Sequence, residues 1–547
     1  MDSLSRLVES DAVRRLKDRD PLLFSDDVDL RQPILQRLGW TDLATAALGR
    51  TTLANNLARS LVDEGARDVV LLGMGGSSLT AVVMSEVIGG QPGMPRLHVL
   101  DSTSPTMVTR LLGSLERSST YFLVSSKSGT TIEPLSLYAI FRSWMEEELE
   151  RPSAGQHFIA ITDPGTPLEK QRQKEFMRVA LSAPPTVGGR FSALSLFGLV
   201  PAAMVGIDLE TLVHHAQTME HACQSPAEDN PAAALAAWMA DLLAQGRDKL
   251  TFVASRRYRA FGLWAEQLVA ESTGKAGGGI VPVVEHEAAL PTGFGPDRLV
   301  VVLRERGDAE LERYAASVRA EHPLMEYVVD GPLEIGAEFV RWEYAIALLG
   351  HLMGINPFDE PNVSEAKKAT NDVLAGAAEV PAAVASLDGV WPTYAGGLAG
   401  AAAPADLSEA LAPLLAAVRP GDYVAVLGYL PYDDAYFEPL GRAGRRLSAA
   451  LRTAVCIEMG PRYLHSTGQL HKGGPDTGVF LLLTNRERAN VAVPGQKFSL
   501  AQLYRAQAEG DLLTLARYGR RVMRLDLPGD DMATFEAVVR ALGHAAG

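Results

Sequence analysis

The stretch YFLVSSKSGTTIEPLS, residues 121–136, crowds five hydroxyl side chains around one lysine and one glycine. An apolar segment typical of a β-strand precedes this cluster, and a segment typical of a helix follows it. Hydroxyls and backbone N–H groups at such a strand-to-helix turn can surround a phosphate. The same residues could instead cap the helix and fill a turn. The stretch is not the P-loop of nucleotide hydrolases, whose GxxxxGK followed by Ser or Thr does not occur in the chain.

A second strand-to-helix turn, LLGMGGSSL at residues 71–79, contains three glycines that permit close backbone approach to a ligand. Two serines, Ser77 and Ser78, open the helix that follows. The G-x-G-G spacing lacks the third glycine of the dinucleotide fingerprint, so this turn is only a weak signal for a nucleotide.

Two charged residues stand where a helix end could tune their chemistry. Arg190 follows a glycine pair and precedes Ser192, which we expect to cap an apolar helix, so its guanidinium could stabilise an oxyanion at the helix mouth. Glu271 lies in the last turn of a helix that Gly274 stops. The negative end of the helix dipole there would raise the pKa of the carboxyl toward that of a general base. A turn arginine and an exposed glutamate are the alternative interpretations.

The stretch GINPFDEPNVSEAKKATNDVL predicts a helix with Asn362 as N-cap and Glu365 at the third helical position. Lys367 falls on the apolar face of this helix, whereas Lys368 is turned away by about 100°. An inward lysine could serve a site, or it could extend its amine out to solvent.

The elements that must position these residues alternate between short apolar runs and helical patterns. RDVVLLGMGG, LHVLDS, TYFLVSSKSG and HFIAITDPG each end in turn residues and precede helix-like sequence, which predicts βαβ units and a mostly parallel sheet. The alternation of apolar runs and helical patterns begins again near Asn230, and a third time after a stretch rich in Ala, Gly and Pro. In such folds ligands bind at the carboxyl ends of the strands.

The length, net charge and cysteine content of the chain exclude several classes of protein. A chain of 547 residues predicts two or three domains. The net charge of −15 argues against general binding to nucleic acid or to anionic membranes. Two cysteines are too few for a disulfide scaffold or a cysteine-rich metal site, and no signal peptide or membrane span is apparent, so a cytoplasmic location is expected.

Taken in order, GMGGSSL, SSKSGTTIEP, GGRFSALSLFGL, ESTGKAGGGIVP and GINPFDEPNVSEAK resemble the glucose-6-phosphate isomerase family. These segments span Gly73 to about Lys368. The resemblance implies an α/β fold with two sugar-isomerase (SIS) domains, each a flavodoxin-like parallel-sheet αβα sandwich, and we expect a C-terminal α/β lobe besides. It also implies a hexose phosphate as the small-molecule partner, no metal or cofactor, no nucleic acid or membrane partner, and a homodimer.

The expected domain boundaries follow from the rhythm and the resemblance together. They are an N-terminal helical segment at 1–39, a first, phosphate-binding SIS domain at 40–228, a second SIS domain with the catalytic Glu and Lys at 229–380, a connector at 381–410 and a C-terminal α/β lobe at 411–547.

The resemblance also implies roles for single residues. Glu271 would be the base that moves a proton between C2 and C1, Arg190 would stabilise the enediolate, and Lys367 would sit by the ring oxygen. The substrate-binding residues would be Gly76, Ser77, Ser126, Lys127, Ser128 and Thr131, while Ser125 and Thr130 would only complete the turn. The family usually has Gln where this chain has Glu360 beside the phosphate, and a second anion there would weaken binding unless it is protonated or turned away.

The histidine that opens the sugar ring has three candidates. The C-terminal segment PRYLHSTGQLHKGGPDTG, and the chain as a whole, resembles the isomerase half of fused transaldolase–isomerase enzymes. Within that segment His471 is the first choice and His465 the second, with a surface loop as the alternative interpretation. His286 lies between the glutamate and the FD motif, where the family has its histidine, but its sequence context differs.

These assignments predict an enzyme of glycolysis and gluconeogenesis that interconverts glucose 6-phosphate and fructose 6-phosphate through a cis-enediolate. One alternative is a broader isomerase that also accepts mannose 6-phosphate. The other is a non-catalytic sugar-phosphate sensor built on SIS domains.

Overall fold

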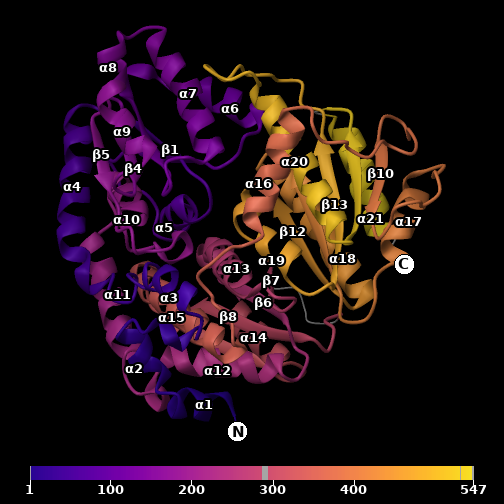
Figure 1. The fold of residues 1–547 in the computed structure, drawn as a ribbon, viewed down its shortest axis with the longest axis horizontal. Coiled ribbons are helices and arrows are strands. Elements are labelled where there is room, and N and C mark those ends of the chain that lie inside the picture. The colour runs from indigo at the N-terminus through magenta and orange to yellow at the C-terminus, as the bar shows by residue number, and fades with distance from the viewer. Residues whose placement is uncertain (1, 286–292, 530, 545–547) are drawn as a thin grey trace.

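Three β-sheets follow one another along the chain in the computed structural model, which describes residues 2–285, 293–529 and 531–544 (Figure 1). His286 lies outside the described residues. All paired strands are parallel except one edge strand of the third sheet, which confirms the predicted parallel-sheet α/β fold.

The first sheet has the strand order β2-β1-β3-β4-β5. Its strands are β1 (Asp68–Leu72), β2 (Arg96–Leu100), β3 (Thr120–Ser125), β4 (Phe158–Thr162) and β5 (Val179–Ser182). The central strands β1, β3 and β4 are buried along their whole length, as expected for a parallel sheet covered by helices on both faces. This order is flavodoxin-like, with its topological switch point between β1 and β3.

The second sheet has the order β7-β6-β8-β9. Its strands are β6 (Lys249–Ala254), β7 (Val281–Glu285), β8 (Arg298–Glu305) and β9 (Leu324–Val329). Helix α13 (Arg259–Thr273) follows β6 and packs against α5 (Leu79–Val87) of the first sheet, so a single hydrophobic core runs through both units.

The third sheet forms a C-terminal lobe with the order β10-β14-β13-β11-β12. Its strands are β10 (Trp391–Gly396), β11 (Tyr423–Tyr429), β12 (Ala454–Met459), β13 (Gly478–Asn485) and β14 (Arg521–Leu527). Strand β10 lies inside the segment 381–410 that was expected to be a connector only. Trp391, Thr393 and Tyr394 favour extended backbone, and the strand pairs antiparallel with β14 at the sheet edge.

The helices cover the sheets and join them. The N-terminal helices are α1 (Ser3–Glu9), α2 (Ala12–Lys17) and α3 (Val28–Leu35). Those around the first sheet are α4 (Leu48–Asp63), α5, α6 (Pro105–Leu112), α7 (Ile132–Glu146), α8 (Arg151–Gly155), α9 (Pro167–Lys174) and α10 (Leu196–Met204). Those around the second are α11 (Leu209–Cys223), α12 (Pro231–Leu243), α13, α14 (Ala309–Arg319) and α15 (Ile335–Met353). Helix α16 (Val363–Leu374) follows them in the chain but packs against the C-terminal lobe (Figure 1). The C-terminal lobe has α17 (Leu407–Ala416), α18 (Asp434–Leu451), α19 (Gly468–Gly473), α20 (Leu500–Arg517) and α21 (Met532–His544).

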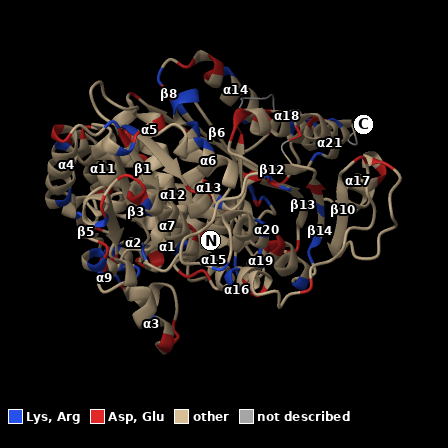
Figure 2. Ribbon diagram, turned by 90° about the horizontal axis from the view of Figure 1, so that it is seen from above, with Lys and Arg blue, Asp and Glu red and all other residues tan. Residues whose placement is uncertain are grey.

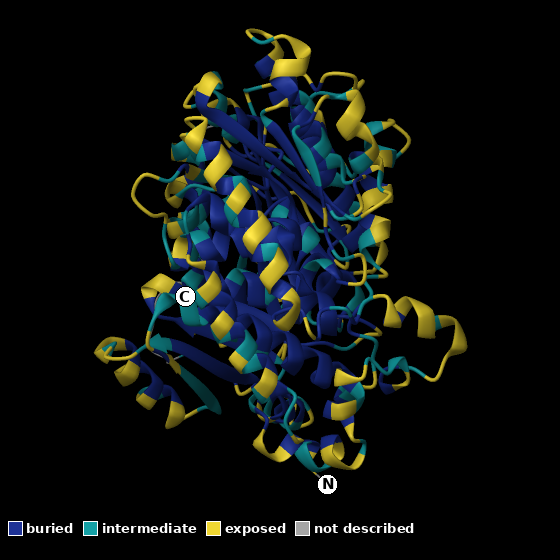
Figure 3. Ribbon diagram, turned by 90° about the vertical axis from the view of Figure 1, so that its left-hand side faces the viewer, coloured by how far each residue is buried: buried dark blue, intermediate teal, exposed yellow. Residues whose placement is uncertain are grey.

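Exposed and buried residues separate cleanly in this arrangement. Figure 3 shows buried strands at the centre and exposed residues on the outer faces of the helices. Figure 2 shows acidic and basic residues interspersed along the ribbon. No helix in the described ranges combines the length and apolar content needed to cross a bilayer.

Two helix caps differ from the sequence prediction. Helix α10 is capped by Ser195, whose hydroxyl accepts from the Phe197 N–H, and not by Ser192, whose hydroxyl donates to the Gly189 carbonyl. Asn362 precedes α16 but makes no side-chain cap bond, and its Oδ1, the atom that would accept that bond, accepts instead from the Gln469 amide of the C-terminal lobe at 2.7 Å. A neighbouring turn carbonyl thus binds the Ser192 hydroxyl, and a long-range partner binds the Asn362 oxygen.

The C-terminal lobe docks onto the carboxyl edge of the first sheet. Arg462, in the 3₁₀ turn η9 (Arg462–His465), donates from Nε and Nη2 to the two carboxylate oxygens of Asp101 at 2.8 and 2.9 Å. Asp101 is fully buried, so water does not solvate its carboxylate, and the Arg462 guanidinium compensates the negative charge instead.

Asp101→Ala should therefore lower the free energy of unfolding by about 3 kcal/mol, because it leaves the Arg462 guanidinium with an uncompensated charge. The control is Arg110→Ala, which breaks the exposed pair between Arg110 and Asp433 that joins the same two units, and should cost less than about 1 kcal/mol. Urea unfolding of both variants measures the difference. Equal losses would contradict the special weight given to the buried pair.

Candidate active site

A cavity of about 300 Å³ opens where the first sheet, the second unit and the C-terminal lobe meet. Its walls come from the loops after β1 and β3, the 3₁₀ turn η5 (Gly189–Phe191), the end of α13, the start of α16 and the turn η9. A smaller cavity of about 160 Å³ adjoins it beyond Lys367 and His465.

The loops after β1 and β3 flank the switch point of the first sheet and are tied to each other. The Ser125 hydroxyl donates to the Ser77 carbonyl at 2.9 Å, so it joins the two loops, whereas the sequence predicted only that it completes its own turn. Gly76 packs so closely on η5 that an added Cβ would lie 2.1 Å from the Gly189 carbonyl oxygen. The glycine thus brings the β1 loop and the Arg190 loop into contact at the cavity.

The hydroxyl loop gathers its side chains around Thr131. The Ser126 hydroxyl donates to Thr131 Oγ1 at 3.2 Å, and Ser128 Oγ lies 3.5 Å from the same atom and 3.0 Å from Thr130 Oγ1. Thr131 is the N-cap residue of α7 but makes no side-chain cap bond, so no side chain of that residue blocks the first-turn N–H groups. Helix N-termini of this kind bind anions.

Lys127 lines the cavity while its amine forms an ion pair with Asp163 and donates to the Pro185 carbonyl at 3.4 Å. Burial raises the pKa of Asp163, although Lys127 opposes the effect. Gly129 adopts φ +64°, and an added Cβ would lie 2.9 Å from Thr166, which explains the glycine in this turn.

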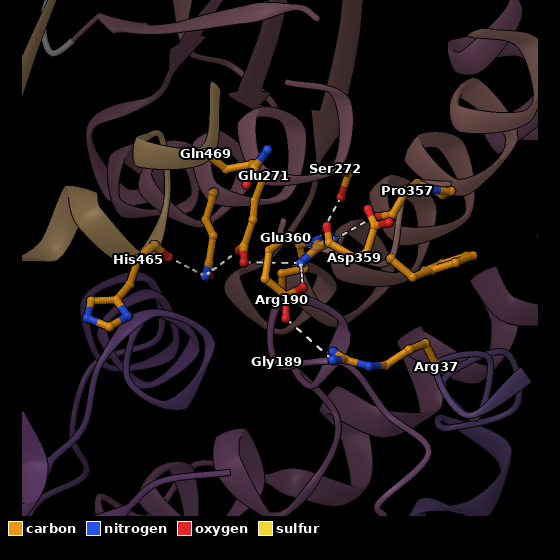
Figure 4. A network of polar contacts seen from close by, with 12 residues as sticks. Arg37, Gly189, Arg190, Glu271, Ser272, Pro357, Asp359, Glu360, His465 and Gln469 are labelled. Carbon is orange, nitrogen blue, oxygen red and sulfur yellow. Dashed lines mark hydrogen bonds and ion pairs between the residues drawn. The ribbon is translucent and has the colours of Figure 1, made fainter. Parts of the chain in front are cut away.

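Arg190 is buried and fixed on every side (Figure 4). Its Nε donates to the Ser272 hydroxyl at 2.9 Å, and Nη2 donates to the carbonyls of Pro357 and Asp359 at 2.6 and 3.0 Å. Its Nη1 lies 3.1 Å from Oε1 of Glu271. The guanidinium therefore faces the cavity with its orientation set by α13 and by the loop before α16.

Glu271 occupies the last turn of α13, as predicted, and is 9% exposed. The Gln267 amide one turn earlier donates to its Oε2 at 3.1 Å and to the His465 carbonyl at 2.7 Å. Burial raises the pKa of Glu271, while Arg190 opposes the shift. A carboxylate with a raised pKa at the wall of a cavity has the properties of a general base.

Glu360 reaches Arg190 instead of pointing freely into the cavity. Its Oε2 accepts from Nη1 of Arg190 at 3.2 Å and its Oε1 from Nη2 of Arg37 at 3.4 Å. Burial acts to raise the pKa of Glu360, but Arg190 and Arg37 outweigh it and hold the pKa below its ordinary value. The carboxylate is thus ionised and turned toward two arginines.

Lys367 lies on the cavity side of α16, and Lys368 points away, 74% exposed and paired with Asp372. The buried residues of the helix are Ala366, Ala369 and Thr370, so Lys367 borders the cavity from an exposed position and is not part of the buried face. Lys367 also lines the adjoining smaller cavity.

His465 lines the cavity from the C-terminal lobe. Its Nε2 lies 2.9 Å from Oε1 of Glu133, and the Gln507 amide donates to the same oxygen at 2.7 Å. Burial acts to raise the pKa of Glu133, but the charge and hydrogen bond of His465 outweigh it and lower the pKa. The imidazole is therefore oriented by a buried carboxylate.

His471 is 1% exposed and does not line the cavity. Its Nε2 lies 3.4 Å from Oε1 of Glu458, and its ring packs against Tyr423 and Phe480 inside the C-terminal lobe. The structure thus brings the second-choice histidine to the cavity and keeps the first choice in the core of the lobe.

Several residues that line the two cavities, among them Glu133, Gln267, Arg37 and Asp163, were not assigned to the site from the sequence. Glu133 stands inside the quoted hydroxyl stretch, and Gln267 lies one helical turn before Glu271, so spacing could have suggested both. Arg37 carries no local signal, because only the folding of the N-terminal segment onto the Arg190 loop brings it to the cavity.

The comparisons with known proteins agree with this geometry. Residues 60–292 match the family model described as phosphoglucose isomerase. A protein of Haloarcula marismortui named "Probable glucose-6-phosphate isomerase" is 30% identical over 358 residues, which cover 58% of this chain and 80% of that protein. A protein of the same name from Methanococcus maripaludis is 29% identical over 356 residues, 56% of this chain and 79% of the relative.

Two solved structures resemble the fold. A hypothetical protein from Thermus thermophilus gives a TM-score of 0.59 at 27% identity and covers 68% of this chain and 96% of its own. A glucose-6-phosphate isomerase from Chlamydia trachomatis gives a TM-score of 0.56 at 21% identity and covers 69% and 86%, which supports the fold alone. On the strength of its sequence relatives, the chain belongs to the phosphoglucose isomerase family.

Proposed function

We propose that this protein is a glucose-6-phosphate isomerase, which interconverts glucose 6-phosphate and fructose 6-phosphate. The observation that carries the proposal is the buried Glu271 carboxylate 3.1 Å from the fixed Arg190 guanidinium, opposite the hydroxyl loop, in one cavity. A base, an oxyanion partner and an anion site at this spacing fit the two ends of one sugar phosphate.

The phosphate end of the substrate is assigned to the hydroxyl loop. Ser126, Ser128 and Thr131 offer hydroxyls, and the first turn of α7 offers backbone N–H groups with the positive end of the helix dipole. Lys127 adds a positive charge nearby, although its amine is partly neutralised by Asp163. Gly76 and Ser77 would face the sugar with their backbone.

The proton transfer is assigned to Glu271. Its carboxylate takes the C2 proton of the open-chain aldose, and the electron pair of that bond forms the C1=C2 double bond while negative charge moves to O1. Arg190 stabilises this cis-enediolate, a contribution that is typically about 3 kcal/mol for a well-placed donor. Return of the proton to C1, with the proton of the C2 hydroxyl passing to O1, gives the ketose.

Ring opening is assigned to His465 with Lys367, in place of the first choice, His471. The Glu133 carboxylate orients the His465 ring, and the imidazole and the Lys367 amine border the same space. His471 is enclosed by aromatic rings of the lobe core, where a sugar has no access.

The finer family relationship is also a proposal. The C-terminal lobe supplies His465 and Gln507 to the site, which supports the likeness to the isomerase half of fused transaldolase–isomerase enzymes. The homodimer implied by the family is retained as the proposed assembly.

Purified protein should convert glucose 6-phosphate to fructose 6-phosphate at a rate that a chelator does not change, because the proposed steps use side chains only. A parallel assay with mannose 6-phosphate tests the broader alternative. Binding of sugar phosphate without turnover would contradict the proposal and favour the sensor.

Glu271→Gln should lower kcat by at least about 10³-fold with KM little changed, because the amide cannot accept the proton. In the unchanged protein, kcat/KM should fall as the pH decreases through the raised pKa of Glu271, above the ordinary 4.5, since protonation removes the base. Initial rates between pH 4 and 8 measure both effects. Rapid turnover by the glutamine variant would refute the assignment of the base.

His465→Gln should lower kcat for the cyclic substrate by about 10²-fold, the usual contribution of a positioned acid–base group. The matched variant is His471→Gln in the same short segment, which should change thermal stability more than kcat because His471 is buried in the lobe. A larger loss of kcat in the folded His471 variant would restore the first choice.

A further inference from the structure

The N-terminal segment is held against the site by its main chain. Leu38 forms an isolated antiparallel bridge with Val187, and the Gly39 N–H donates to the Thr186 carbonyl at 2.9 Å. An added Cβ at Gly39 would lie 2.0 Å from the Thr186 hydroxyl, so the two strands of chain are in close contact. Arg37 is therefore fixed beside the loop that carries Arg190.

The Arg37 side chain points along this loop to Glu360 (Figure 4). Its Nη2 lies 3.4 Å from Oε1 of Glu360, and its side chain is 34% exposed, so part of the guanidinium is shielded from water. Its positive charge also acts on Asp163, another residue of the cavity wall.

Glu360 and Glu271 share one donor. Oε2 of Glu360 and Oε1 of Glu271 lie 3.2 and 3.1 Å from the same Nη1 of Arg190. Two carboxylates on one guanidinium leave a net negative charge in the same cavity as the loop assigned to a phosphate, which is itself anionic. Arg37 completes a row of alternating charges, Arg37–Glu360–Arg190–Glu271, whose sum is zero.

We propose that Arg37 is a positioning residue that acts through Glu360: it neutralises this carboxylate and holds it against Arg190, so that an acidic residue can stand beside the phosphate without repelling the substrate. Glu360 in turn becomes one of the groups that fix the Arg190 guanidinium. The inference rests on the proposed function, because it assumes an anionic sugar phosphate in the cavity.

A carboxylate at position 360 acts on Glu271 differently from the neutral glutamine amide that the family usually has there. Burial and the Glu360 charge both act to raise the pKa of Glu271, and Arg190 opposes them. An ionised Glu360 thus favours the basicity of the carboxylate that takes the proton, and Arg37 is one of the charges that keep Glu360 ionised. The Glu360 charge therefore supports the base, while Arg37 limits its cost to substrate binding.

A double-mutant cycle of Arg37→Gln, Glu360→Gln and the double variant tests the proposal. Arg37→Gln alone should raise the KM for glucose 6-phosphate about tenfold with a smaller change in kcat, because the uncompensated Glu360 charge repels the phosphate. In the Glu360→Gln background the same Arg37 substitution should change KM by less than about threefold. Arg37→Lys, which keeps the charge, should restore most of the lost affinity.

The matched control is Arg31→Gln, because Arg31 is exposed on α3 in the same N-terminal segment and lies outside the cavity lining. Its KM should equal that of the unchanged protein. An equal effect of Arg37→Gln in both Glu360 backgrounds would overturn the proposal and make Arg37 a direct substrate ligand. No effect in either background would overturn it as well.

The activity of the unchanged protein distinguishes failure of the proposed function from failure of the Arg37–Glu360 proposal. If that protein does not isomerise glucose 6-phosphate, the function fails, and the cycle is then measured by calorimetric binding of 5-phosphoarabinonate, an aldonic acid phosphate whose carboxylate mimics the enediolate. Loss of affinity in Arg37→Gln and its absence in the double variant would support the pair without any turnover. Should Arg37→Gln not fold, the comparison of Arg37→Lys with Glu360→Gln/Arg37→Lys decides the same question: the proposal requires both to keep their affinity, and a loss in either overturns it.

Discussion

The buried charge of Arg190 is the constraint on which the arrangement of the site depends. A guanidinium removed from water must find a partner for each donor, and here the Ser272 hydroxyl, the carbonyls of Pro357 and Asp359, and two carboxylates provide them. These partners lie on α13 and on the loop before α16, while Arg190 belongs to the first unit. Satisfying one side chain therefore fixes the second unit against the first, and the common hydrophobic core of the two units keeps that distance.

Polar contacts also fix the C-terminal lobe, the third unit, against the first two. It carries no residue of the phosphate loop, yet it closes the cavity with His465, and Gln469 donates to the Gly274 carbonyl at the end of the Glu271 helix. Arg462 and Asp101 anchor the turn from which His465 projects. Because the Arg462–Asp101 pair is buried and His465 belongs to the same turn as Arg462, the contact that docks the lobe also fixes the backbone position of His465.

Much of this could be predicted from the sequence because local order carries it. Parallel strands ending in turn residues predicted the α/β sheets, and helical periodicity selected Lys367 over Lys368. Several of the errors share one cause, which is a long-range contact that the local sequence pattern does not encode. The side-chain oxygen of Asn362 accepts from Gln469 instead of capping its helix. His471 packs in an aromatic core, and His465 pairs with Glu133, 332 residues away in the chain. Arg37 had no local signal at all.

The charge balance of the cavity explains why single residues were hard to interpret in isolation. A carboxylate serves as a base only if burial raises its pKa, yet the cation that stabilises the enediolate lowers that pKa again. Glu271 and Arg190 stand in this opposition, and the pKa of Glu271 is still raised overall, because burial outweighs the arginine and Glu360 works in the same direction. Glu360 therefore conflicts with a phosphate site only when it is considered alone. Beside Arg37 and Arg190, the same carboxylate adjusts how strongly the arginine acts on the base.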